Sequence, residues 1–169
     1  MFLPYLACGK CCIVSKEINH HEFDKNKKED ICHTILTALP EWFEIPESIE
    51  EYALSVREMP LWADIENDTC RGFISLRETS THAAEIYVMG ILKEYHINGL
   101  GHLLWEAFLE YAKEYGYEYV QVKTVKKGQY KEYDITNAFY EKIGFKELEC
   151  FPNLWDEWNP CQVYVKYIA

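Results

Sequence analysis

The stretch His96-Ile97-Asn98-Gly99-Leu100-Gly101 lies between a run typical of a β-strand, residues 85–92, and a strongly amphipathic segment, residues 102–115. Its two glycines let the backbone turn sharply and approach a ligand without an obstructing Cβ. The first N–H groups of a helix have no partner within the helix, and the helix dipole adds partial positive charge beside them. The order strand, glycine loop, helix therefore predicts a binding site for a phosphate group. A tight connection between a strand and a helix, without any ligand, is the alternative interpretation.

Two well-known phosphate loops are excluded by the residues that follow. The dinucleotide fingerprint needs a third glycine, which is absent after Gly101. A Walker loop needs Gly-Lys followed by Ser or Thr, and this sequence is also absent. A second motif, Asn137-Ala-Phe-Tyr-Glu-Lys-Ile-Gly-Phe145, follows about forty residues later, after another run typical of a strand.

With both motifs in this order and at this spacing, the chain resembles the GNAT superfamily of N-acetyltransferases. That superfamily typically carries Gln/Arg-x-x-Gly-x-Gly/Ala, then a helix, a strand, and an Asn-x-x-Phe-Tyr-x-x-x-Gly-Phe segment. Here His96 stands where Gln or Arg is usual, whereas Gly99, Gly101 and the segment 137–145 match. The resemblance covers about residues 60–168 and is weak before them.

The resemblance implies a mixed α/β fold with a central, mostly antiparallel sheet, one parallel and splayed strand pair, and helices on both faces. The hydrophobic pattern fits this fold, because a strand, a helix and a strand between residues 82 and 125 indicate one parallel crossover. We expect one domain over residues 1–169, with a motif-bearing core at about 60–168 and an acceptor-side part at about 1–59. The expected strands are 11–17, 61–66, 71–78, 82–92, 117–125, 146–150 and 161–168, and the expected helices are 29–39, 45–58, 102–115 and 134–143.

Composition narrows the class of protein. A net charge of −11 without a concentrated basic patch disfavours nucleic acid as a partner. No apolar run is long enough for a membrane span, and the apolar residues 1–8 are too short and lack the basic leader of a signal peptide. Seven cysteines without disulfide-scaffold spacing favour a reducing compartment, so we expect a cytoplasmic protein, monomeric or homodimeric.

The resemblance also implies acetyl-CoA as co-substrate. By that resemblance, the Met89 amide polarises the thioester carbonyl, the Ile91 backbone pairs with pantetheine, and Asn137 and Tyr140 lie near the cofactor. The phosphate cradle is expected to comprise His96, Ile97, Asn98, Gly99, Leu100, Gly101 and His102. The side chains of His96 and His102 either contact phosphate or are simply exposed.

Tyr140 is the candidate general acid. On a helix that begins near an N-cap at Asp134, the residues Ile135, Phe139 and Ile143 recur every fourth position as a buried stripe, which predicts that Asn137 and Tyr140 lie on the opposite side. A phenol is protonated at neutral pH and can donate to a departing thiolate. By resemblance, a tyrosine at this motif position lies near the CoA sulfur. A surface or half-buried tyrosine without a catalytic role is the alternative.

Glu85 is the candidate general base. By resemblance to the histone-acetylating branch of the superfamily, its place four residues before Met89 is that of a catalytic glutamate. A carboxylate within a central strand is costly unless it is paired or hydrated. Strict alternation would place Glu85, Tyr87 and Met89 on one face of the strand, without saying which face is the active one. A glutamate that faces solvent or pairs with a lysine is the alternative. Gly90, inside the same strand, predicts a bulge or a close backbone approach where a cofactor lies.

The acceptor and any metal are less well defined by the sequence. The N-terminal part combines carboxylates with aromatic rings, which suits a cationic amine, although an acidic amphipathic helix explains them equally well. These residues are Glu41, Glu44, Glu47, Glu50, Glu51, Trp42, Phe43 and Trp62. Cys8, Cys11 and Cys12, with His20 and His21, provide one Cys-x-x-Cys pair and adjacent histidines rather than a complete zinc site, so no metal is expected.

These observations predict an acetyl-CoA-dependent N-acetyltransferase that acts on a primary amine, either of a small cationic molecule or of a peptide or protein. Transfer is expected to be direct within a ternary complex, without an acylated cysteine. A non-catalytic module that binds and senses CoA or acyl-CoA is the alternative, and a metal-dependent regulatory protein built on residues 8–21 is a second one.

Overall fold

The protein is built around a seven-stranded sheet with the strand order β1-β2-β3-β4-β5-β7-β6. The computed structural model describes residues 19–20 and 23–169. The strands are β1 (Asn19–His20), β2 (Leu61–Glu66), β3 (Thr69–Ser80), β4 (Ala83–Ile91), β5 (Tyr119–Val125), β6 (Lys146–Phe151) and β7 (Cys161–Tyr167). The helices are α1 (Lys25–Thr37), α2 (Pro46–Ser55), α3 (Leu100–Glu114) and α4 (Lys131–Lys142), with short 3₁₀ turns η1 (Val56–Glu58) and η2 (Lys93–Tyr95).

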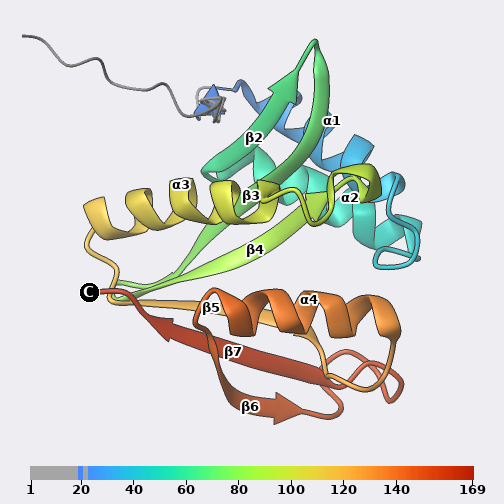
Figure 1. Ribbon diagram of the computed structural model, residues 1–169, viewed down its shortest axis with the longest axis vertical. Helices are drawn as coiled ribbons and strands as arrows, with labels where there is room; N and C mark the ends of the chain where they lie inside the picture. The colour runs from blue at the N-terminus through green and yellow to red at the C-terminus, as the bar shows by residue number, and fades with distance from the viewer. Residues whose placement is uncertain (1–18, 21–22) are drawn as a thin grey trace, which may run out of the picture.

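The centre of the sheet contains one parallel pair, β4 with β5, and every other strand pair of the described residues is antiparallel. β4 pairs with β5 only over residues 83–86, against residues 119–122. Beyond Ile86 the two strands diverge, and the lower half of the molecule, with β5, β6, β7 and α4, separates from the upper half (Figure 1). The predicted splayed parallel pair is confirmed.

Helices cover both faces of the sheet, as predicted. α1 and α2 pack on β2, β3 and β4 through an apolar cluster that includes Ile35, Leu36 and Phe73. α3 and α4 pack on the other face through a larger cluster that includes Trp62, Trp105 and Phe145. Burial of these two clusters, at about 25 cal/mol per Å² of apolar surface, is the main stabilising term of the fold. No helix in the described part of the chain is long and apolar enough to cross a membrane.

A β-bulge in β4 sets which side chains face which helices. Ser75 lies opposite Val88 and Leu76 lies opposite Ile86, so Tyr87 is the additional residue. As a result Tyr87 and Val88 both pack toward α1 and α2, whereas Met89 and Ile91 pack toward α3. The expectation of strict alternation from Glu85 through Tyr87 to Met89 is therefore wrong at the bulge.

Local signals explain most element ends. Asp24 accepts a hydrogen bond from the Lys27 N–H at 2.9 Å, so α1 begins at Lys25, four residues earlier than expected. Pro46 opens α2, as predicted, because its missing N–H would have no partner in the first turn. The turn Asn67-Asp68 has positive φ at both residues and joins β2 to β3 as a hairpin. The strand expected at residues 11–17 lies outside the described residues.

Gly90 marks a close approach, but by a helix rather than by a cofactor. A Cβ added there would lie 2.7 Å from Cγ2 of Ile35 and 3.3 Å from the side chains of Leu36 and Leu39. The absent side chain thus lets α1 pack directly against β4. The bulge that Gly90 also predicted lies three residues earlier, at Tyr87.

Candidate active site

The phosphate cradle predicted from the glycine loop has the expected geometry. Gly99 is left-handed at φ +79° and forms the N-cap of α3, and its carbonyl accepts the N–H groups of His102 and Leu103, both at 3.1 Å. Among the described residues, the N–H groups of Gly99, Leu100 and Gly101 have no backbone partner. Positive φ at Ile97 as well as at Gly99 produces the alternating backbone that lets successive N–H groups converge. This loop can therefore bind an anion through backbone groups alone.

The two glycines have different neighbours. A Cβ at Gly99 would meet nothing within 4 Å. A Cβ at Gly101 would lie 3.1 Å from the Phe139 ring of α4 and 3.3 Å from Ile91 of β4. Gly101 therefore allows α3, α4 and the end of β4 to meet beside the free N–H groups.

The edge of β4 that faces away from β3 is open beyond Ile86. Alternate residues of an antiparallel strand direct their N–H and C=O groups toward the partner. The Leu92 N–H donates to the Arg71 carbonyl at 2.9 Å, so Leu92 and Gly90 face β3, whereas Met89 and Ile91 direct their backbone groups toward the side where β5 has diverged. These are the two residues predicted to pair with a thioester and a pantetheine arm, and their N–H groups are in a suitable place.

The side chains of the cradle contribute less than its backbone. His96 Nε2 donates to the Ile91 carbonyl at 2.8 Å, and its ring packs edge-on against Trp42. The His102 ring is exposed and lies 3.5 Å from Glu106 of the same helix. Asn98 is exposed, with Nδ2 3.5 Å from the Glu94 carbonyl, while Leu100 is buried in the core. Neither histidine is fixed at the free N–H groups by a contact in this structure.

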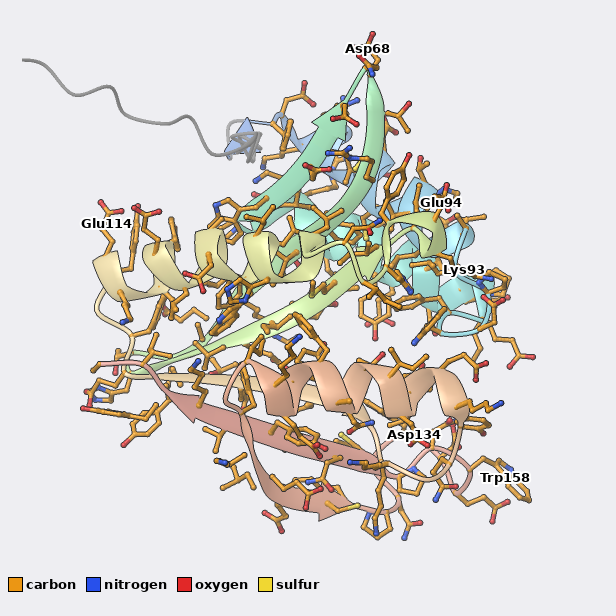
Figure 2. The ribbon with its side chains drawn as sticks, in the orientation of Figure 1. Asp68, Lys93, Glu94, Glu114, Asp134 and Trp158 are labelled. Carbon is orange, nitrogen blue, oxygen red and sulfur yellow. The ribbon has the colours of Figure 1, made fainter. Side chains whose placement is uncertain are left out.

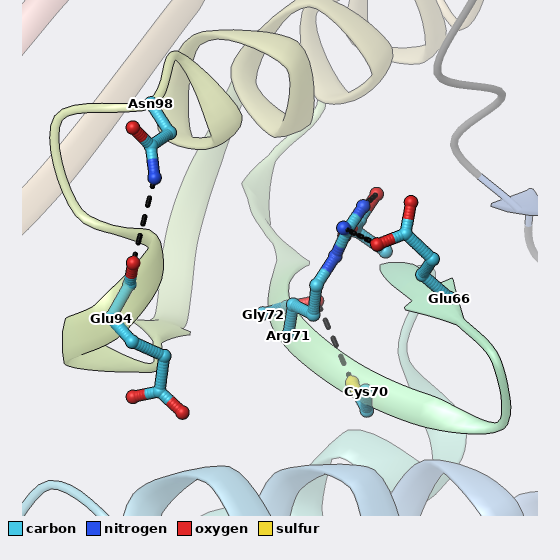
Figure 3. Close-up of polar contacts among 7 residues, drawn as sticks. Glu66, Cys70, Arg71, Gly72, Glu94 and Asn98 are labelled. Atoms are coloured by element: carbon cyan, nitrogen blue, oxygen red, sulfur yellow. Dashed lines mark hydrogen bonds and ion pairs between the residues drawn. The ribbon is translucent and has the colours of Figure 1, made fainter.

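A buried ion pair supports the segment that leads into the cradle (Figure 3). The Arg71 guanidinium, 7% exposed, donates to both carboxylate oxygens of Asp64 at 2.5 and 3.0 Å and also pairs with Glu66. It lies 5.3 Å from the ring centroid of Tyr95, the last residue of η2. Because the Arg71 backbone also accepts the Leu92 N–H, this residue holds both ends of η2.

Tyr140 is buried, so the prediction that it lies opposite the buried side of α4 is wrong, and so is the burial predicted for Ile135, whereas Ile143 is buried as predicted. Asn137 is 0% and Tyr140 6% exposed, whereas Ile135, expected to be buried, is 63% exposed. α4 begins at Lys131 after an N-cap at Tyr130, and the Asp134 carboxylate instead accepts the Gly128 N–H at 2.7 Å. Figure 2 shows Asp134 on α4 in the lower half of the molecule. The helix therefore presents to the core the side that contains both motif residues.

The two motif residues differ in how their polar groups are used. Asn137 donates to the carbonyls of Val125 and Tyr133 at 3.0 and 2.6 Å and accepts the Tyr164 hydroxyl at 2.8 Å, so its amide ties α4 to β5 and β7. In the described part of the chain, every fully buried side-chain nitrogen or oxygen has a hydrogen-bond partner. The Tyr140 hydroxyl has no such partner among these residues. It is therefore not fully buried and keeps some contact with solvent. Burial raises the pKa of Tyr140, so this hydroxyl stays protonated at neutral pH.

Glu85 is 3% exposed and is held by two cations. Arg77 donates to Oε2 through Nε at 3.1 Å and through Nη2 at 2.5 Å, and Lys123 Nζ donates to Oε1 at 2.8 Å. The pair with Lys123 matches the alternative interpretation of Glu85, in which the glutamate pairs with a lysine. The contact also identifies Arg77 and Lys123 as site residues that sequence reasoning missed. They lie on β3 and β5, and only the sheet register brings them to Glu85 on β4.

The α1–α2 connection joins the two sides of the site. Trp42 Nε1 donates to Thr136 Oγ1 at 3.1 Å, and the Tyr133 hydroxyl donates to the Trp42 carbonyl at 2.7 Å, so the connection is fixed to α4. The Trp42 ring also contacts His96, which is hydrogen-bonded to Ile91, so the α1–α2 connection is fixed to the end of β4 as well. Trp62, also expected near the acceptor, is instead fully buried against Phe108 on the α3 face.

The predicted acidic acceptor residues are mostly engaged elsewhere or exposed. Glu41 pairs with Lys93, and Glu50 lies 3.1 Å from His33. A pocket of about 310 Å³ between α1 and α2 is lined partly by Phe43, Glu44 and Glu50, but by no residue of the cradle or of β4. Glu44 and Glu50 therefore line a pocket of their own, separate in its lining from the cradle and from β4.

Three of the described cysteines, Cys32, Cys70 and Cys161, are not suited to covalent chemistry. Burial raises the pKa of the Cys32 thiol to about 12 and those of Cys70 and Cys161 to about 11, which leaves all three as neutral thiols. In the described part of the chain, no group of three or more His, Cys, Asp or Glu residues could hold a metal ion. Cys8, Cys11, Cys12 and His21 lie outside the described residues.

Comparison with solved structures places the fold among acetyltransferases. A GNAT-family protein from Desulfovibrio desulfuricans superposes with a TM-score of 0.76 at 13% identity, over 90% of this chain and 99% of that one. An aminoglycoside 6'-N-acetyltransferase complexed with coenzyme A gives a TM-score of 0.71 at 18% identity, over 90% and 97%. The ribosomal-protein-S18-alanine N-acetyltransferase from Escherichia coli gives 0.71 at 16% identity, over 90% and 94%.

Sequence comparison agrees at the level of the family. No curated protein sequence matches this chain. The family model described as the acetyltransferase (GNAT) family matches residues 28–145, which include both motifs, the bulged strand and the diverging strand pair. By that match and by its fold, the chain belongs to the GNAT acetyltransferase family.

Proposed function

We propose that the protein is an acetyl-CoA-dependent N-acetyltransferase that acetylates a primary amine by direct attack within a ternary complex. The observation that carries the proposal is the coincidence of three free N–H groups in the cradle with the open edge of β4 at Met89 and Ile91. A phosphate-bearing thioester with an amide-containing arm suits both features, because the first binds anions and the second can extend the strand.

The cofactor contacts follow from this arrangement. The pyrophosphate of acetyl-CoA would be held in the loop of residues 96–102 by the free N–H groups of Gly99, Leu100 and Gly101, where any larger side chain at Gly101 would press on Phe139. The Ile91 N–H would pair with the pantetheine arm, while the Ile91 carbonyl already accepts one hydrogen bond from His96. Direct cofactor contact by Asn137 is the weakest of the predicted contacts, because its amide is fully used in the core.

Acetyl transfer forms a bond between the amine nitrogen and the acetyl carbon, breaks the bond between carbon and sulfur, and moves one proton from nitrogen to sulfur. Acetyl-CoA supplies the thioester when bound. The Met89 N–H would donate to the developing oxyanion. Tyr140, kept protonated by burial, would donate to the departing thiolate.

Glu85 remains our candidate for removing the proton of the acceptor amine through water. Arg77 and Lys123 donate to its two carboxylate oxygens and hold the carboxylate in place. Burial keeps Cys32, Cys70 and Cys161 as neutral thiols, which supports transfer without an acyl-cysteine.

The same proposal keeps three expectations from the sequence. The chain acts as a single acetyltransferase domain, it works in the cytoplasm, and it is a monomer or a homodimer. The acceptor is a small molecule or a peptide or protein amine.

The test is steady-state thiol release from acetyl-CoA in the presence of a panel of amines, with calorimetric binding of CoA measured in parallel. We expect thiol release that depends on the acceptor and on enzyme concentration. Tight CoA binding without acceptor-dependent release from any amine would instead favour the non-catalytic CoA-binding module.

A further inference from the structure

The three residues Arg77, Glu85 and Lys123 form a charged cluster with a net charge of +1. Glu85 is almost fully buried, with a side chain 4% exposed, whereas the side chains of Arg77 and Lys123 are 41% and 29% exposed. The carboxylate is therefore shielded from an incoming molecule, and the two cations are what such a molecule would meet. Although the whole chain carries −11, an anion placed at this cluster would be attracted locally.

The cluster also has unused hydrogen-bond donors. A guanidinium has five N–H donors and an ammonium has three. Glu85 uses two N–H groups of Arg77 and one of Lys123. Each cation keeps donors for a second acceptor, and a carboxylate is the group that a guanidinium fork and an ammonium bind most directly.

Aromatic rings border the cluster on the α1 and α2 face. The Arg77 guanidinium lies 4.5 Å from the centroid of the Tyr87 ring. Tyr87 packs edge-on against Tyr52 of α2 at 5.5 Å, and Tyr52 packs against Phe43 at 5.9 Å. All three aromatic residues are partly buried, which provides an apolar surface next to the cations.

The cluster lies close to the predicted reaction centre. Arg77 sits over Tyr87, and Tyr87 precedes Met89 by two residues on β4. Two residues of an extended strand span roughly 7 Å. An anion bound by these cations would therefore lie along the same strand as a thioester held at the Met89 N–H.

We propose that the acceptor is an amine that carries a carboxylate a few bonds from its nitrogen, as in a free amino acid, and that Arg77 and Lys123 bind this carboxylate. The inference rests on the proposed acetyltransferase function and narrows its acceptor. It departs from the cationic amine suggested by the acidic N-terminal part, because Glu41 and Glu50 are paired elsewhere, whereas the charged cluster around Glu85 has a net positive charge.

The experiment compares matched acceptors that differ only in the carboxylate. The pairs are phenylalanine with phenethylamine, leucine with isoamylamine, and lysine with cadaverine. Thiol release gives kcat/KM for each member, and calorimetry gives its binding to the enzyme saturated with CoA. We expect each amino acid to exceed its decarboxylated partner about tenfold or more in both measurements, the effect of one hydrogen-bonded charge pair.

Variants assign the effect to the cluster. Lys123→Met leaves Glu85 paired with Arg77, and it is expected to reduce the preference for the amino acid about tenfold, mainly through KM. Lys123→Arg keeps the positive charge and is expected to retain the preference for the amino acid. Lys127→Met is the matched control, since Lys127 is an exposed lysine that pairs with Glu141 on α4. Circular dichroism and CoA binding confirm that each variant is folded.

The outcomes separate the two proposals. Thiol release with phenethylamine equal to or faster than with phenylalanine overturns the carboxylate inference and leaves the acetyltransferase proposal intact. An amino-acid preference unchanged by Lys123→Met also overturns it. If no acceptor supports thiol release, the function proposal fails, while selective calorimetric binding of the amino acids still supports the carboxylate site and its absence refutes it.

Discussion

The cofactor side and the acceptor side of the candidate site are built from different parts of the chain. The cofactor side uses the free main-chain N–H groups of Gly99, Leu100 and Gly101 and the edge of β4, a nearly continuous stretch of sequence. The acceptor side uses the side chains of Arg77, Glu85 and Lys123 from three strands. A site made of backbone leaves a trace in the sequence wherever glycine is needed, whereas a site made of distant side chains is recognisable only once the sheet register is known.

Substitution of the cradle glycines is the strongest test of this contrast. Gly101→Val is expected to weaken acetyl-CoA binding at least about 100-fold, because its side chain would press on Phe139 and Ile91 beside the free N–H groups. Gly99→Val should have a similar effect, since it strains a residue at φ +79° and extends into the open space of the cradle.

Gly116→Val is the matched control for Gly99→Val. Gly116 has φ +80°, also meets nothing within 4 Å, and lies beyond the opposite end of α3. Calorimetry should show normal acetyl-CoA binding by this variant despite a comparable loss of thermal stability. Near-normal binding by both cradle variants would show that the cofactor side is not built from these backbone groups.

Tyr140→Phe tests whether a side chain of the core takes part in the chemistry. We expect turnover to fall about 100-fold, the usual scale of general-acid assistance, while acetyl-CoA affinity changes by no more than a few-fold. Steady-state kinetics and calorimetry on the same preparation measure both. Unchanged turnover, with chemistry shown to be rate-limiting, would make Tyr140 a packing residue only.

Glu85→Gln distinguishes a base from a charge-setting residue on the acceptor side. As a base, Glu85 should matter most at neutral pH, so we expect a rate loss of about tenfold there that recovers as pH approaches the pKa of the free amine. The same change removes a negative charge from the cluster and should lower KM for a carboxylate-bearing acceptor. A loss of kcat that is equal at every pH would contradict the role of base.

The smallest expected effect concerns Tyr133, which joins the two sides through Trp42. Burial raises the pKa of Tyr133 to about 12, above the ordinary value of about 10 in an unfolded chain. The folded state therefore holds its proton more tightly, so the associated stability is complete below about pH 10 and is lost as pH rises toward 12. Thermal melts at pH 9 and at pH 11 give the decrease in the free energy of unfolding between these two pH values. This decrease should be about 1 kcal/mol smaller for Tyr133→Phe than for the unaltered protein. Equal losses would show that Tyr133 ionises as freely as an exposed tyrosine.

The sequence predicted much of the fold because its turn and glycine signals act locally. The hairpin at Asn67-Asp68, the end of α3 near Gly116 and the left-handed Gly99 depend on backbone conformations that few other residues adopt. The family resemblance added the splayed strand pair. The diverging edge of β4 follows from it, since residues 87–91 have no partner on β5.

Two features of the site could not be predicted from the periodicity of apolar residues in the sequence. On α4, the apolar spacing of Ile135, Phe139 and Ile143 predicted burial correctly for Ile143 but not for Ile135. It also missed the buried Asn137, whose amide is satisfied within the core by three hydrogen bonds and does not behave as a surface amide. On β4, the bulge at Tyr87 turns Met89 away from Glu85, and no single residue type signals it.

The exposed β6 strand has a consequence for how copies of this protein meet. β6 is an outer strand of the sheet, and Lys146, Glu147, Leu148 and Glu149 are all exposed along it. Charged side chains at three of these four positions make the strand a poor template for hydrogen bonding to a strand from another molecule. At high concentration this edge therefore resists the growth of intermolecular sheets, and aggregation by that route is suppressed without a covering helix.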